Sequence, residues 1–272
     1  MTGVYRGCAG LGLSLGDDSV LRMVLDRPDK RNALDDDMVA AMIAAVEASE
    51  RDESVRAILL SGAGEHFCGG FDIVSRNAAP ADRRPRAGSI QRRLPSQAHR
   101  LIPLLLSVQV PVVCAVRGWA AGIGLHLAVA ADFAVVAEDA RFWEPFTERG
   151  FTPDSGGTWM LPRRLGEVRA RELLVLGRAL SGLEAVDWGL VHRAVPTVDV
   201  LDDADALAVR LAGGPTVALG LTKWLMHRGT DASLADHLRD EAFALELSSR
   251  SDDFREGLLA FTEKRPPRFT GR

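Results

Sequence analysis

Two glycine-rich segments are the first candidates for a catalytic site. One is the segment 61–72, which reads SGAGEHFCGGFD, and the other is the segment 118–124, which reads GWAAGIG. Glycine lets a backbone turn sharply and approach a ligand closely. The second segment is predicted to open a helix, whose first N–H groups lack intrahelical acceptors. If both segments direct an N–H group at one carbonyl oxygen, they form an oxyanion hole, in which each donor is typically worth about 10²–10³ in rate.

Other interpretations of these glycines are ordinary tight connections or a dinucleotide-binding turn. Neither segment completes the G-x-G-x-x-G pattern of such a turn, because Phe67 and Leu127 stand where its last glycine belongs. A separate match to the G-x-S-x-G nucleophile elbow occurs at 12–16, but a turn and a second strand are predicted after it, where the elbow needs a helix. A serine hydrolase is therefore disfavoured.

Two titratable side chains could move protons at such a site. Asp154 lies in the turn 153–157, which reads PDSGG and is predicted to open a helix, so it is either a helix N-cap or an acid/base. His126 lies near the start of the helix that follows the second glycine segment. It could be a second acid/base, a donor that orients Asp154, or a core histidine.

The elements that must position these residues alternate along the chain. Strand-like runs at 12–15 and 20–25 flank a turn and predict an antiparallel hairpin. Asp35 can cap a helix over 36–50. Apolar patterns then predict strands and helices in turn, at 55–61, 96–107, 111–117, 122–131 and 133–137. This alternation indicates an α/β class with the site near strand ends.

After about residue 198 the pattern becomes almost wholly helical, at 199–213, 216–228, 233–250 and 251–264. The sequence therefore predicts an α/β core over 1–198 with the site and a helical region over 199–272. Between core elements, the segment 75–100 carries seven arginines and three prolines, which predicts a solvated loop. Alternatively, its charges steer a polyanionic ligand toward the site.

Composition narrows the class of partner. The 33 basic and 37 acidic residues give a formal net charge of −4, which does not favour nucleic acid or an anionic membrane. No apolar run approaches the roughly 20 residues of a membrane span. The three cysteines show no zinc-like pairing, and the amino terminus has no basic region followed by an apolar signal core, which predicts a reducing cytoplasm. A small-molecule substrate is the expected partner.

The ordered motifs resemble those of the enoyl-CoA hydratase/isomerase (crotonase) superfamily over about residues 12–269. They are the hairpin, the two glycine segments and the segments 27–34, 153–158 and 261–265. The segments 151–162 and 251–272 especially resemble phenylacetate-pathway isomerases, which act on ring-epoxidised phenylacetyl-CoA and unsaturated acyl-CoAs. The resemblance implies a spiral α/β core of repeated ββα units with a helical trimerisation region, and thus a homotrimer or dimer of trimers. It also implies an acyl-CoA substrate and neither metal nor redox cofactor.

The resemblance also implies residue roles. The backbone N–H groups of Phe71 and Ile123 correspond to those that hold the thioester oxygen, and Gly70 and Gly122 precede them. Lys264 corresponds to a lysine that relatives often supply to a neighbouring subunit, although Lys264 could also be a plain surface lysine. The adenosine and diphosphate contacts of the family correspond to five residues: Lys30, Arg31, Ala33, Asp72 and Ile73.

The sequence departs from the family's hydratases at the two catalytic glutamates, where it has His126 and Phe146. Asp154 matches the acid/base aspartate of relatives that isomerise CoA esters, with Phe146 as an apolar wall. One carboxylate can remove and return the proton of an allylic isomerisation. An enoyl-CoA isomerase is therefore predicted. The alternatives are a hydratase or CoA-ester hydrolase that uses His126 with Asp154, and a CoA-ester-binding oligomer without catalysis.

Overall fold

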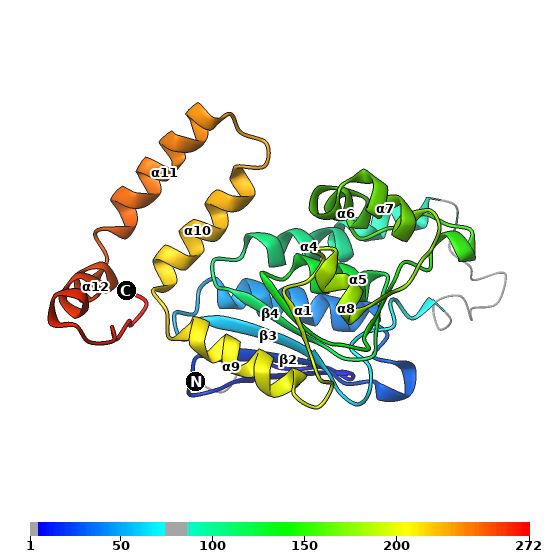
Figure 1. The fold of residues 1–272 in the computed structure, drawn as a ribbon. Coiled ribbons are helices and arrows are strands. Elements are labelled where there is room, and N and C mark those ends of the chain that lie inside the picture. The colour runs from blue at the N-terminus through cyan, green and yellow to red at the C-terminus, as the bar shows by residue number, and fades with distance from the viewer. Residues whose placement is uncertain (1–4, 74–85, 87) are drawn as a thin grey trace.

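The computed structural model describes residues 5–73, 86 and 88–272, in which two sheets carry the elements of the predicted α/β core (Figure 1). The larger sheet has the order β1-β2-β3-β4-β6-β9 and is parallel from β2 onward. Its strands are β1 Leu11–Leu15, β2 Val20–Leu25, β3 Ala57–Gly62, β4 Val112–Val116, β6 Phe133–Ala137 and β9 Arg193–Val195. The smaller sheet, in the order β5-β7-β8, comprises β5 Trp119–Ala121, β7 Arg141–Trp143 and β8 Leu180–Ser181.

The first elements follow the predicted pattern. β1 and β2 form the antiparallel hairpin, and β2 pairs in parallel with β3 after the helix α1 Asp36–Ser49. The Asp35 carboxylate caps α1 by accepting a hydrogen bond from the Met38 N–H at 2.9 Å. Every residue of β3 and β4 is buried, as expected for parallel strands covered on both faces.

Repeated units of two strands and a helix connect the sheets. β4, β5 and the helix α5 Ile123–Ala130 form one unit, and β6, β7 and α6 Gly157–Leu165 form the next. In each unit the first strand joins the large sheet and the second joins the small sheet. The remaining helices of the body are α3 Ser89–Arg93, α4 Ala98–Ser107, α7 Glu167–Leu174, α8 Gly182–Asp187 and α9 Val200–Ala212. The short 3-10 helices are η1 Pro28–Lys30, η3 Leu94–Ser96 and η4 Thr147–Arg149.

The carboxy-terminal part is helical, as predicted. α9 packs on β3 and β4, whereas α10 Thr216–Arg228, α11 Leu234–Ser248 and α12 Asp252–Glu263 extend away from the sheets (Figure 1). The proposed division of the chain at residue 198 stays a prediction. Among the described residues, no helix has the length and apolar character needed to cross a membrane.

One prediction needs correction within the arginine-rich segment. Most of 75–87 lies outside the described residues. The second half of the 75–100 segment is not a loop as predicted, because residues 89–93 and 94–96 form α3 and η3. Leu94 is buried there, so an apolar anchor outweighs the polar composition around it.

Candidate active site

The two glycine segments lie side by side at the carboxyl ends of β3 and β4, which are neighbours in the sheet. Cys68 and Ala120 form a parallel bridge, in which the Cys68 N–H donates to Trp119 O and the Ala121 N–H donates to Cys68 O, both at 2.9 Å. Gly70 approaches the Ala121 carbonyl so closely that an added Cβ would lie 3.3 Å from its oxygen. The loop that carries Phe71 and the turn that carries Ile123 are therefore held together, as the sequence predicted.

Ile123 is the first residue of α5, at the position where a helix leaves backbone N–H groups without intrahelical acceptors. Gly122 before it has φ 53° and ψ −121°, which directs the chain out of β5 and into the helix. Burial raises the pKa of the nearby Cys68 thiol to about 12. This cysteine of the first loop is therefore a core residue and not a nucleophile.

The residues assigned to coenzyme A by resemblance lie beside the first glycine segment. The Leu34 N–H donates to Gly70 O at 2.8 Å, and the Gly69 N–H donates to Arg31 O at 2.7 Å. Both Lys30 and Arg27 donate to Asp72 Oδ2 at 2.8 Å. The structure thus joins the Lys30–Ala33 segment to the loop of Gly70, Phe71, Asp72 and Ile73, with Lys30 and Arg31 exposed.

Asp154 lies in the turn before α6 but does not cap that helix. The N-cap is Gly156, and α6 begins at Gly157 without a side-chain cap. The Asp154 carboxylate instead accepts a hydrogen bond from the Ser155 hydroxyl, at 3.0 Å from Oδ1. On the backbone, His99 Nε2 of α4 donates to Asp154 O at 2.8 Å. The N-cap interpretation of Asp154 is therefore wrong.

His126 is fully buried and engaged at both ring nitrogens. Its Nδ1 lies 2.8 Å from Ser155 Oγ and its Nε2 lies 2.7 Å from Glu144 Oε1. The ring stacks on Phe146, with centroids 6.2 Å apart and an interplanar angle of 5°. Phe146 also touches the second glycine turn, since a Cβ on Gly122 would lie 3.4 Å from its Cζ.

Sequence reasoning missed Glu144, which is buried to the same degree as His126. The pairing of strands in the small sheet brings Glu144 close to His126. β5 and β7 are parallel with Ala121 opposite Trp143, so Gly122 and Glu144 leave adjacent strand ends, and the Gly122 N–H donates to Trp143 O. His126 follows one helical turn later, with its N–H donating to Gly122 O at 3.0 Å. The sequence did contain one signal for Glu144, which is the single acidic residue within the apolar run 142–146. A carboxylate buried among apolar residues needs a polar partner.

A cavity of about 510 Å³ adjoins Asp154 and Ser155 between α4 and α6. Its walls are mainly apolar, as suits an acyl chain. Its lining includes Ala98, Ile102, Pro103, Leu106, Trp159 and Met160.

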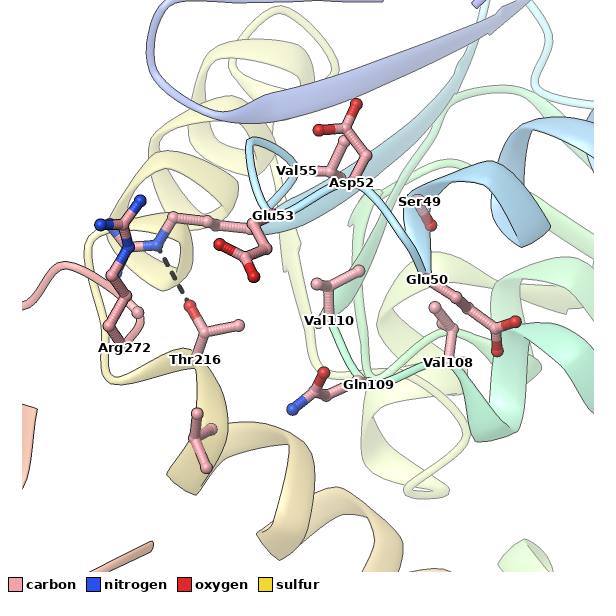
Figure 2. A pocket seen from close by; sticks show the side chains of 13 residues that line it. Ser49, Glu50, Asp52, Glu53, Val55, Val108, Gln109, Val110, Thr216 and Arg272 are labelled. Carbon is pink, nitrogen blue, oxygen red and sulfur yellow. Dashed lines mark hydrogen bonds between the residues drawn. The ribbon is translucent and has the colours of Figure 1, made fainter. Parts of the chain in front are cut away.

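A second cavity of about 400 Å³ lies at the other end of the sheet, near the starts of β3 and β4 (Figure 2). Arg56 is one of its lining residues and donates to Thr216 Oγ1 at 3.1 Å. The acidic residues Glu50 and Glu53 also line it (Figure 2). It contains none of the residues that the sequence analysis singled out.

Lys264 is not brought to the rest of the site within one chain. It follows α12 with a left-handed φ of 54° and is exposed, and α12 lies far from α6 (Figure 1). Within the described part of the chain, no three His, Cys, Asp or Glu side chains are arranged to hold a metal ion.

The chain is similar to known proteins over almost its whole length. The family model described as enoyl-CoA hydratase/isomerase matches residues 16–272. A 1,2-epoxyphenylacetyl-CoA isomerase of Escherichia coli (strain K12) is 38% identical over 96% of this chain and 98% of its own. A carnitinyl-CoA dehydratase of Proteus mirabilis (strain HI4320) is 33% identical over 93% of this chain and 96% of its own.

Solved structures show the same fold. The crystal structure of an enoyl-CoA hydratase from Polaromonas sp. JS666 superposes with a TM-score of 0.88 at 31% identity, covering 95% of this chain and 99% of that one. The α/β fold of repeated ββα units with a carboxy-terminal helical region is thereby confirmed.

Proposed function

Because this chain belongs to the enoyl-CoA hydratase/isomerase family, we propose that it isomerises enoyl-CoA thioesters with Asp154 as the acid/base. The observation that carries the proposal is the difference between two neighbouring carboxylates. Asp154 is partly exposed and lines the apolar cavity, whereas Glu144 is fully buried against His126. Of these two side chains, only that of Asp154 is exposed enough to contact a ligand in the cavity.

In this mechanism the thioester oxygen accepts hydrogen bonds from the N–H groups of Phe71 and Ile123. Asp154 removes a proton from the carbon next to the thioester carbonyl, and the electrons move into a dienolate whose oxygen carries the negative charge. The two backbone donors stabilise that charge. Asp154 then returns the proton to the carbon two bonds further along, so base and acid are the same carboxylate.

The CoA portion would extend along the first glycine segment. Gly70 and Gly122 let the thioester approach the backbone, and Phe146 forms an apolar wall. Lys30, Arg31, Ala33, Asp72 and Ile73 would hold the adenosine and diphosphate groups. These assignments rest on the resemblance and on the contacts that join these residues to the loop.

We further propose a homotrimer or a dimer of trimers in the cytoplasm, in which Lys264 reaches the CoA of a neighbouring subunit. The exposure of Lys264 at the end of α12 supports such a role, because a lysine remote from its own site can serve a neighbouring subunit. No metal or redox cofactor is required, since proton transfer and backbone donors account for every step.

The first prediction tests Asp154. Asp154→Asn should lower turnover of a 3-enoyl-CoA by about 10²–10⁴-fold, because an amide cannot take up and return a proton. Asparagine keeps the size of the side chain and can still accept the Ser155 hydrogen bond, so thermal unfolding should stay near that of the wild type. His126→Ala should lose much less activity.

The result that would overturn the proposal is near-normal turnover by Asp154→Asn with an inactive His126→Ala. Hydration of crotonyl-CoA, measured in parallel, separates the isomerase from the hydratase alternative. The hydratase alternative needs His126 to act on substrate or water, and the complete burial of His126 with both nitrogens engaged argues against it.

A further inference from the structure

Four polar side chains near the acyl cavity form one continuous line of hydrogen bonds. Glu144 Oε1 lies 2.7 Å from His126 Nε2, His126 Nδ1 lies 2.8 Å from Ser155 Oγ, and Ser155 Oγ donates to Asp154 Oδ1 at 3.0 Å. The first three are buried, and the line ends on the partly exposed Asp154. The four residues come from three separate segments, so the line is a product of the fold.

The number of protons that each group carries determines which group donates in each of these hydrogen bonds. An ionised Asp154 can only accept hydrogen bonds, so Ser155 must give its single hydroxyl proton to Oδ1. The Ser155 oxygen is then an acceptor toward His126, and Nδ1 must carry a proton and donate it. Each donor therefore points toward Asp154.

The next proton is shared between His126 Nε2 and Glu144. The pair is either an imidazolium facing a carboxylate or a neutral imidazole facing a protonated carboxyl group, and both forms have no net charge. Burial favours such a compensated pair, because an isolated charge in a dry interior is very costly. Glu144 Oε2 has no hydrogen-bond partner among the described residues, so Glu144 depends on His126 alone.

The imidazole ring is also fixed in place. Phe146 stacks on one face, and Gly157 is so close that an added Cβ would lie 2.1 Å from Nε2. With the register of β5 and β7 fixing Glu144, the ring cannot turn without breaking both hydrogen bonds. The line therefore has one geometry available.

We propose that Glu144, His126 and Ser155 are positioning residues that orient the Asp154 carboxylate. This inference rests on the proposed function, in which Asp154 moves the proton. Ser155 occupies Oδ1, which leaves Oδ2 as the atom that takes the substrate proton.

The test compares two substitutions of one residue. The amide nitrogen of asparagine takes about the place of Nδ1, and that of glutamine takes about the place of Nε2. His126→Gln should therefore lose the donor to Ser155 and lower kcat for a 3-enoyl-CoA by about 10–100-fold, a part of what a positioned acid/base supplies. His126→Asn keeps the donor to Ser155 but loses the partner of Glu144, so it should recover part of that loss. Ser155→Ala should resemble His126→Gln, and KM should change little in all three variants.

A spectroscopic measurement on the unaltered protein tests the direction of the line without turnover. Nitrogen-15 NMR of histidine-labelled wild-type protein should show a protonated His126 Nδ1 at neutral pH. An unprotonated Nδ1 overturns the proposal, and this holds even if a variant fails to fold.

The two hypotheses fail in different ways. Active Asp154→Asn refutes the proposed function. Inactive Asp154→Asn together with wild-type kcat in His126→Gln and Ser155→Ala refutes the positioning role alone.

Discussion

At the scale of single residues, backbone conformation determines what Gly122 can be. Its φ of 53° lies on the side of the Ramachandran plot that a Cβ disfavours, and an added Cβ would already be in van der Waals contact with Phe146, so that the larger side chain of valine would press on the ring. Because Phe146 stacks on His126, a shift of Phe146 would move His126 as well as the start of α5 at Ile123.

The second prediction is that Gly122→Val lowers turnover by at least about 10²-fold, as expected for a displaced oxyanion donor. Backbone strain of this kind typically costs about 1–3 kcal/mol, so the variant should still fold. Gly150→Ala is the matched control, since Gly150 also has a positive φ, 75°, but has no atom within 4 Å of an added Cβ. Steady-state kinetics and thermal unfolding of both variants provide the measurement, and an unimpaired Gly122→Val would refute the oxyanion hole.

At the scale of elements, the distance between α5 and the first glycine loop sets the geometry of the site. Gly124 in α5 packs directly on the loop, because a Cβ there would lie 2.5 Å from Cys68 O. No side chain at this position can be accommodated without moving the helix or the loop.

The third prediction follows from this contact. Alanine normally stabilises a helix interior over glycine by about 1 kcal/mol. Gly124→Ala should instead destabilise the protein, and should lower kcat because the N–H groups of Phe71 and Ile123 move apart. In Gly213→Ala, where an added Cβ meets only ordinary contacts at 3.5 Å, stability and activity should be kept. A Gly124→Ala enzyme with raised unfolding temperature and full activity would contradict this account.

The fourth prediction concerns the attachment of the 264–272 segment to α12. Hydrogen bonds from Arg265 and from the Arg268 N–H lower the pKa of Glu256 from 4.5 to about 2. A lowered pKa contributes stability above the unfolded value, which is lost as the pH falls through the folded value. Wild type should therefore unfold at higher temperature than Glu256→Gln at pH 7, and the difference should vanish between about pH 4.5 and pH 2. A difference that does not depend on pH would exclude the charge as its cause.

Long elements were predictable from the sequence, whereas the contacts between them were not. The strand at 133–137 and the helix at 216–228 follow from apolar periodicity and match the structure. β5 and β7 have three residues each, too few for a period, yet their register brings Glu144 to His126. The hydrogen bond between His126 and Ser155 spans 29 residues, a separation at which local patterns carry no signal.

At the scale of the whole molecule, the carboxy-terminal helices leave much apolar surface uncovered. α11 has 15 residues, of which only Ala244 is buried. Exposed apolar surface of this kind is typical of an interface between chains. Exposed apolar side chains of α10–α12 include Met226, Leu234, Leu238, Phe243, Leu245, Leu258, Leu259 and Phe261.

The fifth prediction is that the wild-type protein sediments as a trimer or hexamer and that Phe243→Glu shifts it toward monomers. Phe243 is 70% exposed in the single chain, so the substitution should disturb association and not folding. If a neighbour supplies Lys264, the dissociated variant should also have a raised KM for acyl-CoA. In contrast, Val198→Glu should remain assembled, because Val198 is even more exposed, at 84%, but lies outside these helices. A monomeric wild type would refute the prediction.

The parallel register of β5 and β7 has a consequence for how new reactions can arise on this scaffold. In the proposed mechanism the oxyanion donors are main-chain N–H groups, which a side-chain replacement can displace but cannot remove. The proton carrier in that mechanism is the side chain of Asp154, and the side chains at 126, 144 and 155 position it. Stabilisation of the enolate thus depends on the main chain, whereas proton transfer depends on side chains. In that mechanism, random substitutions at these four positions should change which protons are transferred, while the backbone donors for the enolate stay in place.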